Sequence, residues 1–282
     1  MKSATVTRLV VKNIPLARSF HASYTLNQRL QKLDGRTALA VGCTEGIGLA
    51  MAKRLAEEGA HVVLGSRQQK NVDKAVKSLT SEGLKASGFT CHVGCNEERK
   101  ALVENTAKNH GGIDILINNA GVNAHTGTFL DTPETAFDKA FDVNVKANFC
   151  LIRDAVPHMG KQNKQGSIVI TSSMSGFQPQ RMPSAYAVSK SALFSLTKAL
   201  MPELLEQNVR INCITLGIFR TPFSDVLTKG KEIREEFLSY IPMKRFGDPS
   251  ECAGLASFLC SDDASYITGE NFAVSGGALS RL

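Results

Sequence analysis

Short apolar runs alternate with longer amphipathic stretches along most of the chain. From about residue 33 onward, each apolar run has the length of a buried strand, and the stretch after it carries apolar positions at helical spacing. The predicted strands cover residues 37–41, 61–64, 86–92, 113–117, 167–171, 210–214 and 271–274. The predicted helices cover residues 49–58, 72–82, 97–110, 133–159, 185–206 and 249–260. This alternation predicts an α/β fold with a doubly wound parallel sheet covered by helices on both faces.

Two features interrupt this regular pattern. Residues 217–247 read as a long irregular segment, and Pro202 falls inside the predicted helix 185–206. Proline lacks a backbone donor, so the helix is expected to bend there. No internal repeat and no Pro/Ser-rich linker divides the chain, and residues 33–279 are therefore predicted to form a single domain.

The two ends of the chain resemble targeting signals for two different organelles. Residues 1–32 contain six basic residues and no acidic one, which is typical of a mitochondrial targeting segment with a processing region near residues 18–23. A disordered, solvated arm is the alternative. At the other end, residues 280–282 read Ser-Arg-Leu, which resembles the Ser-Lys-Leu peroxisomal address. The sequence therefore predicts a peroxisomal location, with a mitochondrial one as the competing possibility.

The net charge of +7 comes almost entirely from the first 32 residues. Removing those six basic residues from the total of 33 leaves 27 basic against 26 acidic residues. No basic stripe with interleaved aromatic residues stands out in this nearly neutral body, so nucleic-acid binding is not expected. No apolar run approaches the roughly 20 residues that a membrane span needs, and no transmembrane helix is expected either.

The seven cysteines are odd in number, scattered, and form no Cys-x-x-Cys pair. This pattern favours reduced thiols in an intracellular compartment over a disulfide framework. Two cysteines and a histidine in residues 91–95, Cys91-His92-Val93-Gly94-Cys95, could supply part of a metal site. No second cluster of ligands follows at a zinc-like spacing. The segment is better interpreted as the end of a buried strand, and no metal is expected.

A glycine-rich turn joins the first predicted strand to the first predicted helix. Its glycines are Gly42, Gly46 and Gly48, with Thr44 and Ile47 between them. A strand, a glycine turn and a helix in this order present a helix N-terminus to a phosphate group. Glycine is required because a side chain would keep the backbone away from the pyrophosphate of a dinucleotide. The turn therefore predicts a nucleotide-binding site.

The residues after the second predicted strand bear on which dinucleotide is bound. An NAD-binding protein of this architecture usually carries an acidic residue there, which accepts hydrogen bonds from the ribose hydroxyls. This chain has Ser66 and Arg67 instead. A hydroxyl and a guanidinium suit a 2′-phosphate, so the prediction is NADP(H) rather than NAD(H). The alternative is that Arg67 is an ordinary solvated loop residue.

A tyrosine and a lysine four residues apart, Tyr186 and Lys190, follow a serine at the end of a strand, Ser173. On a helix the two side chains share one face. A free tyrosine has a pKa of about 10, and a nearby positive charge lowers it, so such a pair can exchange protons with an alcohol or a carbonyl compound. Taken alone, the spacing fits better a helix with Tyr186 packed and Lys190 solvated.

The surrounding motifs change that interpretation, because together they resemble the short-chain dehydrogenase/reductase family over residues 33–279. In chain order the matching motifs are Gly42-x-x-x-Gly46-Ile47-Gly48, Asn118-Asn119-Ala120-Gly121, Asn144, Ser173 and Tyr186-x-x-x-Lys190. The resemblance implies a Rossmann-type fold and an oxidoreductase. Within the family, the chain is most similar to NADPH-dependent carbonyl and retinal reductases of peroxisomes.

The resemblance also implies a role for each catalytic residue. Tyr186 would be the general acid that protonates a carbonyl oxygen, or the base that takes a proton from an alcohol. Ser173 would hydrogen-bond the same oxygen, and Lys190 would lower the tyrosine pKa and hold the nicotinamide ribose. Asn144, which would interrupt a helix, would hold a water that links Lys190 to solvent.

The same resemblance implies the cofactor contacts. They are Gly42, Thr44, Gly46, Ile47, Gly48, Ser66, Arg67, His92, Val93, Asn119, Ala120, Gly121, Tyr186, Lys190, Gly217 and Thr221. The segment after Gly217 would cover the nicotinamide, with Thr221 contacting its carboxamide and the phosphates. The loop near residues 222–245 would close over the substrate, and its apolar residues suit a hydrophobic carbonyl compound or, equally, a subunit interface. The family also implies a homotetramer.

Three residues depart from the family pattern without touching the catalytic set. Val41 stands where threonine is usual, Leu216 replaces a proline, and His92 occupies the place of an aspartate that commonly contacts adenine. The expected activity is NADPH-dependent reduction of apolar ketones and aldehydes, such as aromatic ketones, α-dicarbonyls or retinal. A hydroxysteroid or 3-oxoacyl dehydrogenase is the alternative within the family. A non-catalytic NADP-binding scaffold is the alternative outside enzymes.

Overall fold

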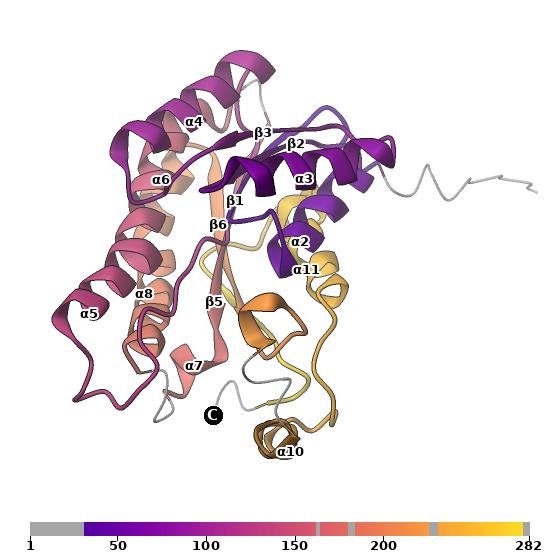
Figure 1. Cartoon of the computed structure of the whole chain (residues 1–282). Helices are drawn as coiled ribbons and strands as arrows, with labels where there is room; N and C mark the ends of the chain where they lie inside the picture. Colours follow the sequence, from indigo (N-terminus) through magenta and orange to yellow (C-terminus); the bar gives the residue numbers. More distant parts are fainter. Residues whose placement is uncertain (1–30, 162–163, 180–183, 226–230, 279–282) are drawn as a thin grey trace, which may run out of the picture.

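The computed structural model describes residues 31–161, 164–179, 184–225 and 231–278, which contain one seven-stranded sheet (Figure 1). The strands are β1 (Thr37–Val41), β2 (His61–Ser66), β3 (Ala86–Thr90), β4 (Ile115–Asn118), β5 (Gly166–Ser173), β6 (Val209–Leu216) and β7 (Asn271–Val274). All neighbouring pairs are parallel, in the order β3-β2-β1-β4-β5-β6-β7. The predicted doubly wound, single-domain α/β fold is confirmed.

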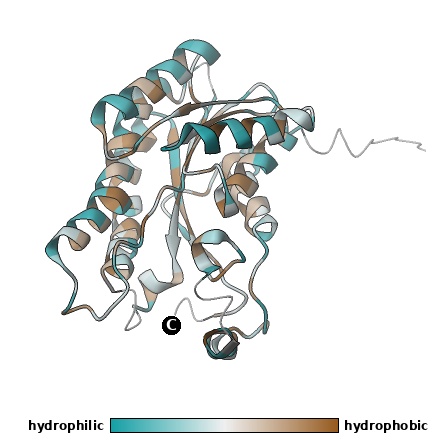
Figure 2. Cartoon of the chain, in the orientation of Figure 1, coloured by the Kyte–Doolittle hydropathy of each residue, from teal (hydrophilic) through white to brown (hydrophobic). Residues whose placement is uncertain are grey.

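Two hydrophobic clusters, one on each face of the sheet, form the core. One face packs against α2 (Gly46–Glu57), α3 (Gln69–Ser81) and α11 (Ser250–Cys260). The other packs against α4 (Asn96–His110), α6 (Ala147–Ala155) and α8 (Ser184–Glu206). Successive residues of β1 alternate between the two clusters, as the two-residue period of a strand requires. The outward side of α3 is hydrophilic (Figure 2).

The strand order reverses between β1 and β4, which lie next to each other at the centre of the sheet. The register pairs Val41, the last residue of β1, with Gly65 of β2 on one side and with Asn118 of β4 on the other. The segments that follow β1, β2 and β4 therefore begin side by side at the carboxyl ends of these strands. In open parallel sheets the crevice at such a reversal, outside the carboxyl ends of the strands, is where ligands bind.

The predicted helix 133–159 is not one continuous α-helix. It is divided into α5 (Glu134–Phe141), the π-helical η1 (Asp142–Lys146), α6 and the 3₁₀ turn η2 (Val156–His158). A π-helical turn arises where a local hydrogen-bonding demand overrides the regular α-helical ladder, and here the turn contains Asn144. In contrast, α8 stays helical through Pro202 to Glu206.

The prediction of an irregular segment over residues 217–247 is wrong in part. The structure contains the 3₁₀ turn η3 (Pro222–Ser224) and the helix α10 (Lys231–Tyr240). The polar sequence of α10 carries apolar residues at positions 233, 237 and 238, which is a helical spacing that the many charges around it obscured. Two short elements, α7 (Met174–Phe177) and η4 (Asp262–Ala264), complete the fold.

Both targeting predictions fall largely or wholly outside the described residues, which begin at residue 31 and end at residue 278. Within the described part, no helix has the length and apolar content to cross a membrane. All seven cysteines are free. Among the same residues, no group of three or more His, Cys, Asp or Glu side chains is placed to hold a metal ion.

Candidate active site

The glycine turn after β1 is joined by one hydrogen bond to β2 and by two to Asn119, which follows β4. The amide of Gly42 donates to the carbonyl of Gly65 at 2.9 Å, and the amide of Asn119 donates to the carbonyl of Val41 at 3.0 Å. The side-chain amide of Asn119 donates back to the carbonyl of Gly42 at 2.7 Å. A Cβ atom on Gly42 would lie 2.6 Å from the Cα of Ala120, so only glycine permits this approach.

The other two glycines of the turn are confined to different degrees, Gly48 as tightly as Gly42 and Gly46 less so. Gly46, at φ +56, is the first residue of α2, and a Cβ atom there would meet the side chain of Thr221 at 3.2 Å. A Cβ atom on Gly48 would lie 2.6 Å from both the side chain of Asn119 and the carbonyl of Gly42. The first turn of α2 carries no acidic residue, so the positive end of its dipole is available to an anion. Thr221, which is distant in sequence, faces this same turn.

The end of β2 is joined to the glycine turn through two hydroxyl groups. Thr44 Oγ1 donates to Ser66 Oγ at 3.2 Å, and the exposed Arg67 follows directly after the strand. Ser66 and Arg67 therefore lie beside the turn that would hold the phosphates. A guanidinium pairs with phosphate oxygens in a fixed geometry.

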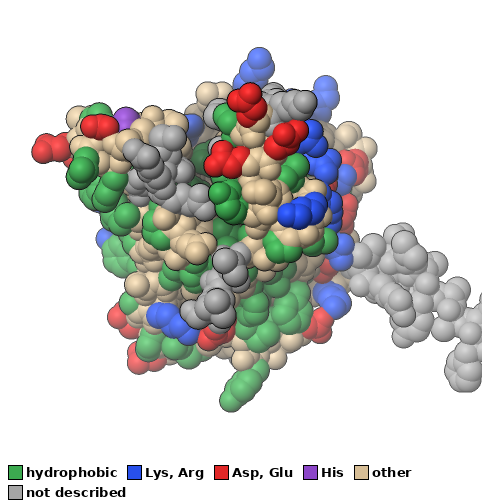
Figure 3. All heavy atoms as spheres, turned by 90° about the horizontal axis from the view of Figure 1, so that it is seen from below, with side chains coloured by type: hydrophobic (Ala, Val, Ile, Leu, Met, Phe, Trp, Pro, Cys, Tyr) green, Lys and Arg blue, Asp and Glu red, His purple; other side chains and the backbone are tan. Residues whose placement is uncertain are grey.

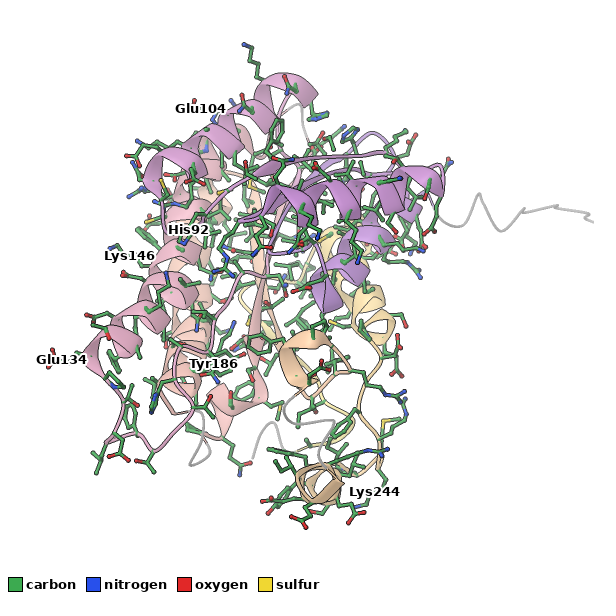
Figure 4. The ribbon with its side chains drawn as sticks, in the orientation of Figure 1. His92, Glu104, Glu134, Lys146, Tyr186 and Lys244 are labelled. Carbon is green, nitrogen blue, oxygen red and sulfur yellow. The ribbon has the colours of Figure 1, made fainter. Side chains whose placement is uncertain are left out.

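His92 and Val93 follow β3 on the same edge of the sheet. The His92 amide donates to Glu98 Oε2 at 2.7 Å, and its ring Nδ1 accepts from the amide of Gly94 at 3.1 Å. His92 also borders a concavity of about 610 Å³ between α4 and the α5–η1–α6 segment, a region on which Lys146 also lies (Figure 4). Tyr186 does not line this concavity, which is therefore distinct from the catalytic residues.

Three of the four predicted catalytic side chains, Ser173, Tyr186 and Lys190, come together where α8 packs against the end of β5. Tyr186 is labelled in Figure 4. The hydroxyl of Ser173 is hydrogen-bonded to Tyr186. Lys190 is buried, and its ammonium lies 5.6 Å from the centre of the Tyr186 ring and donates to the carbonyl of Thr171 at 2.9 Å. A Cβ atom on Gly121 would lie 3.3 Å from Lys190 Nζ, so the segment after β4 closes over the lysine.

Burial displaces the pKa values of both members of the Tyr-Lys pair. It raises the pKa of Tyr186 to about 12, while the hydrogen bond from Ser173 acts in the opposite direction. It lowers the pKa of Lys190 to about 8. The pKa of Tyr186 therefore moves in the direction opposite to the one expected from its lysine neighbour, because the cost of burying a phenolate dominates. At neutral pH, Tyr186 is a neutral phenol and hence a proton donor.

Asn144 lies in the π-helical turn η1 with its side chain completely buried. Its Oδ1 accepts from the amide of Val122 at 2.7 Å, and its Nδ2 donates to the carbonyl of Val122 and to Ser189 Oγ, each at 2.9 Å. The predicted interruption of a helix at Asn144 is confirmed. This side chain joins the segment after β4 to α8, next to Lys190, the predicted catalytic lysine.

The last predicted cofactor residue, Gly217, follows β6 and donates its amide to the carbonyl of Val274 at 2.9 Å. A Cβ atom there would lie 2.7 Å from the Cα of Ser275, so glycine allows the segments that follow β6 and β7 to approach each other closely. Leu216, the departure from the family pattern, is the final residue of β6 and pairs with Val274. The structure thus places the predicted residues from β1, β2, β3, β4, β5, α8 and β6 along one edge of the sheet.

Comparison with known proteins agrees with this arrangement. A family model described as enoyl-(acyl carrier protein) reductase matches residues 42–278. The Bos taurus protein named dehydrogenase/reductase SDR family member 4 is 51% identical over 254 residues, covering 90% of this chain and 91% of that protein. The chain belongs to the short-chain dehydrogenase/reductase family. The Homo sapiens protein of the same name is 48% identical over 254 residues, with the same coverage.

Solved structures of the family share the fold. A short-chain type dehydrogenase/reductase from Mycobacterium marinum has a TM-score of 0.84 and 31% sequence identity, covering 90% of this chain and 99% of that one. As a short-chain dehydrogenase/reductase, the chain is an oxidoreductase whose family binds a nicotinamide cofactor. Three features of the site fit such a dinucleotide. They are the glycine turn after β1, the N-terminus of α2, and the Ser66 hydroxyl with the Arg67 guanidinium after β2.

The sequence did not single out every residue that shapes this site. It missed Ser175, whose hydroxyl donates to Ser173 Oγ at 2.9 Å, and Ser189, which anchors Asn144. It also missed the carbonyl of Thr171, the acceptor for Lys190. Only Ser175 had a recognisable signal, because the side chain of a serine such as Ser173 often accepts a hydrogen bond from the backbone amide two residues later. The other two contacts depend on packing between elements that are distant in sequence.

The face of the molecule at the carboxyl ends of the strands exposes hydrophobic side chains among charged ones (Figure 3). Phe223, on η3, is 62% exposed, and its ring centre lies 6.1 Å from that of Tyr186. Ile233 and Tyr240, on α10, and Met243 are also exposed. Of these exposed apolar side chains, Phe223 is the one that lies beside the predicted catalytic tyrosine.

Proposed function

We propose that this protein reduces apolar ketones and aldehydes to alcohols with NADPH. The observation that carries the proposal is the grouping of Tyr186, which is hydrogen-bonded to Ser173, with the buried Lys190 where α8 packs against the end of β5. The relatives named dehydrogenase/reductase SDR family member 4 support the same class of activity.

The residues for NADP(H) follow from the contacts described above. Gly42, Thr44, Gly46, Ile47 and Gly48 would surround the phosphates, and Ser66 and Arg67 would bind the 2′-phosphate. His92 and Val93 would border the adenine, and Asn119, Ala120 and Gly121 the adjoining ribose. Tyr186, Lys190, Gly217 and Thr221 would hold the nicotinamide half. When bound, NADPH supplies the hydride that the protein itself cannot provide.

The protein's own side chains would supply the proton and stabilise charge. Tyr186 donates its phenolic proton to the carbonyl oxygen of the substrate, and Ser173 donates a hydrogen bond to the same oxygen as negative charge develops on it. Lys190, an ammonium below about pH 8, stabilises the phenolate that Tyr186 becomes. Asn144 keeps the segment after β4 and α8 in register around them.

The side chains near Tyr186 favour an apolar substrate. Phe223 offers an exposed aromatic face 6.1 Å from the Tyr186 ring, so a planar or aromatic carbonyl compound can pack against it. Aromatic ketones, α-dicarbonyls and retinal are therefore the first substrates to test. Hydroxysteroids and 3-oxoacyl compounds form the second panel.

A homotetramer and a peroxisomal location complete the proposal. Phe149 on α6 and Leu205 on α8 are large, exposed hydrophobic side chains that a partner subunit would cover. The Ser-Arg-Leu end favours the peroxisome, and the basic first 32 residues favour the mitochondrion. Imaging of the full chain beside versions that lack either end distinguishes the two locations.

The decisive experiment follows NADPH consumption by the purified protein across these panels. Tyr186→Phe keeps the ring but removes the proton, and it should lower kcat at least about 100-fold. Tyr266→Phe is the matched control, since Tyr266 is fully exposed and should retain wild-type activity. The absence of turnover with every substrate, or full activity in Tyr186→Phe, would show the mechanism to be wrong. Thermal stabilisation by NADPH without any turnover would instead favour a binding scaffold.

A further inference from the structure

Ser175 lies two residues after Ser173, in the single helical turn α7. Ser173 is the N-cap of that turn, and its Oγ accepts a hydrogen bond from the amide of Ser175 at 3.2 Å. The same Oγ also accepts from the hydroxyl of Ser175 at 2.9 Å. One residue thus bonds twice to the side-chain oxygen of the serine that faces Tyr186.

The hydrogen-bonding capacity of a serine hydroxyl makes this double contact informative. Such a hydroxyl has one proton to donate and two lone pairs that accept. In Ser173 both lone pairs are taken by Ser175, one by its amide and one by its hydroxyl. The proton of Ser173 is then left for the remaining neighbour, Tyr186, with which Ser173 is hydrogen-bonded. Ser175 therefore fixes the direction in which Ser173 donates.

The turn that carries Ser175 is firmly held against α8. A Cβ atom on Gly176 would lie 2.9 Å from the backbone of Lys190 and of Ser191. Ser191 Oγ donates to the carbonyl of Gly176 at 2.5 Å, and the rings of Phe177 and Phe194 stack with their centres 4.2 Å apart. Since these contacts fix the backbone of α7 independently of Ser175, replacing the Ser175 hydroxyl should leave the turn in place.

We propose that Ser175 is a positioning residue that holds Ser173 as a hydrogen-bond donor toward Tyr186 and the reacting oxygen. This inference rests on the proposed carbonyl reduction and goes beyond the Ser-Tyr-Lys set. Without the Ser175 hydroxyl, one lone pair of Ser173 is free, and the Ser173 hydroxyl can rotate away. Both the stabilisation of the developing oxyanion and the hydrogen bond to Tyr186 then weaken.

The kinetic test compares Ser175→Ala, which keeps the amide bond, with Ser175→Thr, which keeps a hydroxyl. Loss of one neutral hydrogen bond predicts a kcat about three- to tenfold lower in Ser175→Ala, a KM within about twofold, and recovery in Ser175→Thr. In a Ser173→Ala background, Ser175→Ala should have no further effect. Ser81→Ala, an exposed serine at the end of α3, serves as the control with unchanged kinetics.

The pH profile provides a signature that a purely structural role would not move. The hydrogen bond from Ser173 acts to lower the Tyr186 pKa, so weakening it raises that pKa. Alcohol oxidation requires the phenolate, and its half-maximal rate should therefore shift to higher pH in Ser175→Ala and not in Ser175→Thr. Wild-type kinetics and an unshifted profile in Ser175→Ala, or additive effects with Ser173→Ala, would overturn the proposal.

A spectroscopic measurement tests the same idea without turnover, which separates this inference from the proposed function. Tyrosine labelled at Cζ with an NMR-active carbon isotope gives a resonance that Tyr186→Phe assigns. In Ser175→Ala this resonance should move toward its position in Ser173→Ala, whereas Ser175→Thr should retain the wild-type position. An unmoved resonance in Ser175→Ala overturns the role of Ser175 even if wild-type protein reduces every substrate. A moved resonance supports it even if no substrate is found.

Discussion

Gly42→Ala tests how closely the glycine turn approaches the end of β4. The substitution adds one methyl group at a residue with φ +72, and that methyl would lie 2.6 Å from both the Cα and the amide nitrogen of Ala120. These are backbone atoms at the end of a central strand and cannot turn aside as a side chain can. Either the turn moves away from β4 or the sheet deforms.

The size of the effect can be estimated from two contributions. A left-handed backbone conformation costs a residue with a Cβ atom roughly 1–2 kcal/mol. A steric conflict in a well-packed region adds typically about 1–3 kcal/mol. Gly42→Ala should therefore lower the free energy of unfolding by about 3 kcal/mol, a large share of the roughly 5–15 kcal/mol that keeps a domain folded.

The chain provides graded controls for separating the two contributions. Gly83, after α3, has φ +79 and no atom within 4 Å of an added Cβ, so Gly83→Ala carries the backbone cost alone, about 1 kcal/mol. Gly46 has φ +56 and would meet only the Thr221 side chain at 3.2 Å, so Gly46→Ala should fall between them. The expected destabilisation is smallest for Gly83→Ala, larger for Gly46→Ala and largest for Gly42→Ala.

Urea unfolding followed by far-ultraviolet circular dichroism measures these differences, because the chain contains no tryptophan for fluorescence. All variants are compared at one protein concentration, so that any subunit association contributes equally. Gly42→Ala should also weaken NADPH binding, whereas Gly83→Ala should not. If Gly42→Ala costs no more than Gly83→Ala, the close approach of the turn to Ala120 is wrong.

Two further predictions concern cofactor choice and pH. Arg67→Ala should raise the KM for NADPH about 10- to 100-fold, because it removes a charge-assisted hydrogen bond to the 2′-phosphate, and should change the KM for NADH little. Lys77→Ala is the control, since Lys77 is exposed on α3. Equal effects of Arg67→Ala on both cofactors would refute 2′-phosphate recognition. Burial raises the pKa of the Cys252 thiol to about 12 from 9.0, so the folded state holds its proton more tightly and stability falls as pH rises from 9.0 toward 12. Cys252→Ala should lessen that fall by about 1.4 kcal/mol per pH unit in urea titrations; parallel slopes for the two proteins would contradict it.

The strands and the glycine turn could be predicted from the sequence because their determinants are local. Each apolar run of β1 to β7 was located within a few residues, and the glycines mark where the backbone takes a positive φ or approaches another segment. The parallel order follows from the alternation of strands and helices. Motifs at the carboxyl ends of neighbouring strands then had to share one edge, which brought the predicted site residues together.

The parts that were missed depend on contacts between distant segments. The interruption at Asn144 was expected only from the family resemblance, because the helical pattern over residues 133–159 does not reveal the hydrogen bonds of Asn144 to Val122 and Ser189. The helix α10 carries so many charges that its apolar positions were read as a loop. The expectation that Lys190 lowers the pKa of Tyr186 is wrong, because burial of the phenol raises that pKa and the spacing of the two residues reveals nothing of burial.

That raised pKa bears on the direction of the proposed reaction. Reduction of a carbonyl compound consumes a proton, and a tyrosine with a pKa of about 12 is protonated and ready to supply it at any physiological pH. Oxidation needs the phenolate, which burial disfavours. The ammonium of Lys190 is held by the carbonyl of Thr171 and lies 5.6 Å from the ring, so it stabilises the phenolate after proton transfer more than it promotes ionisation beforehand. In the proposed reaction Tyr186 would thus donate its proton to the carbonyl compound, and this protonation state would suit reduction better than oxidation near neutral pH.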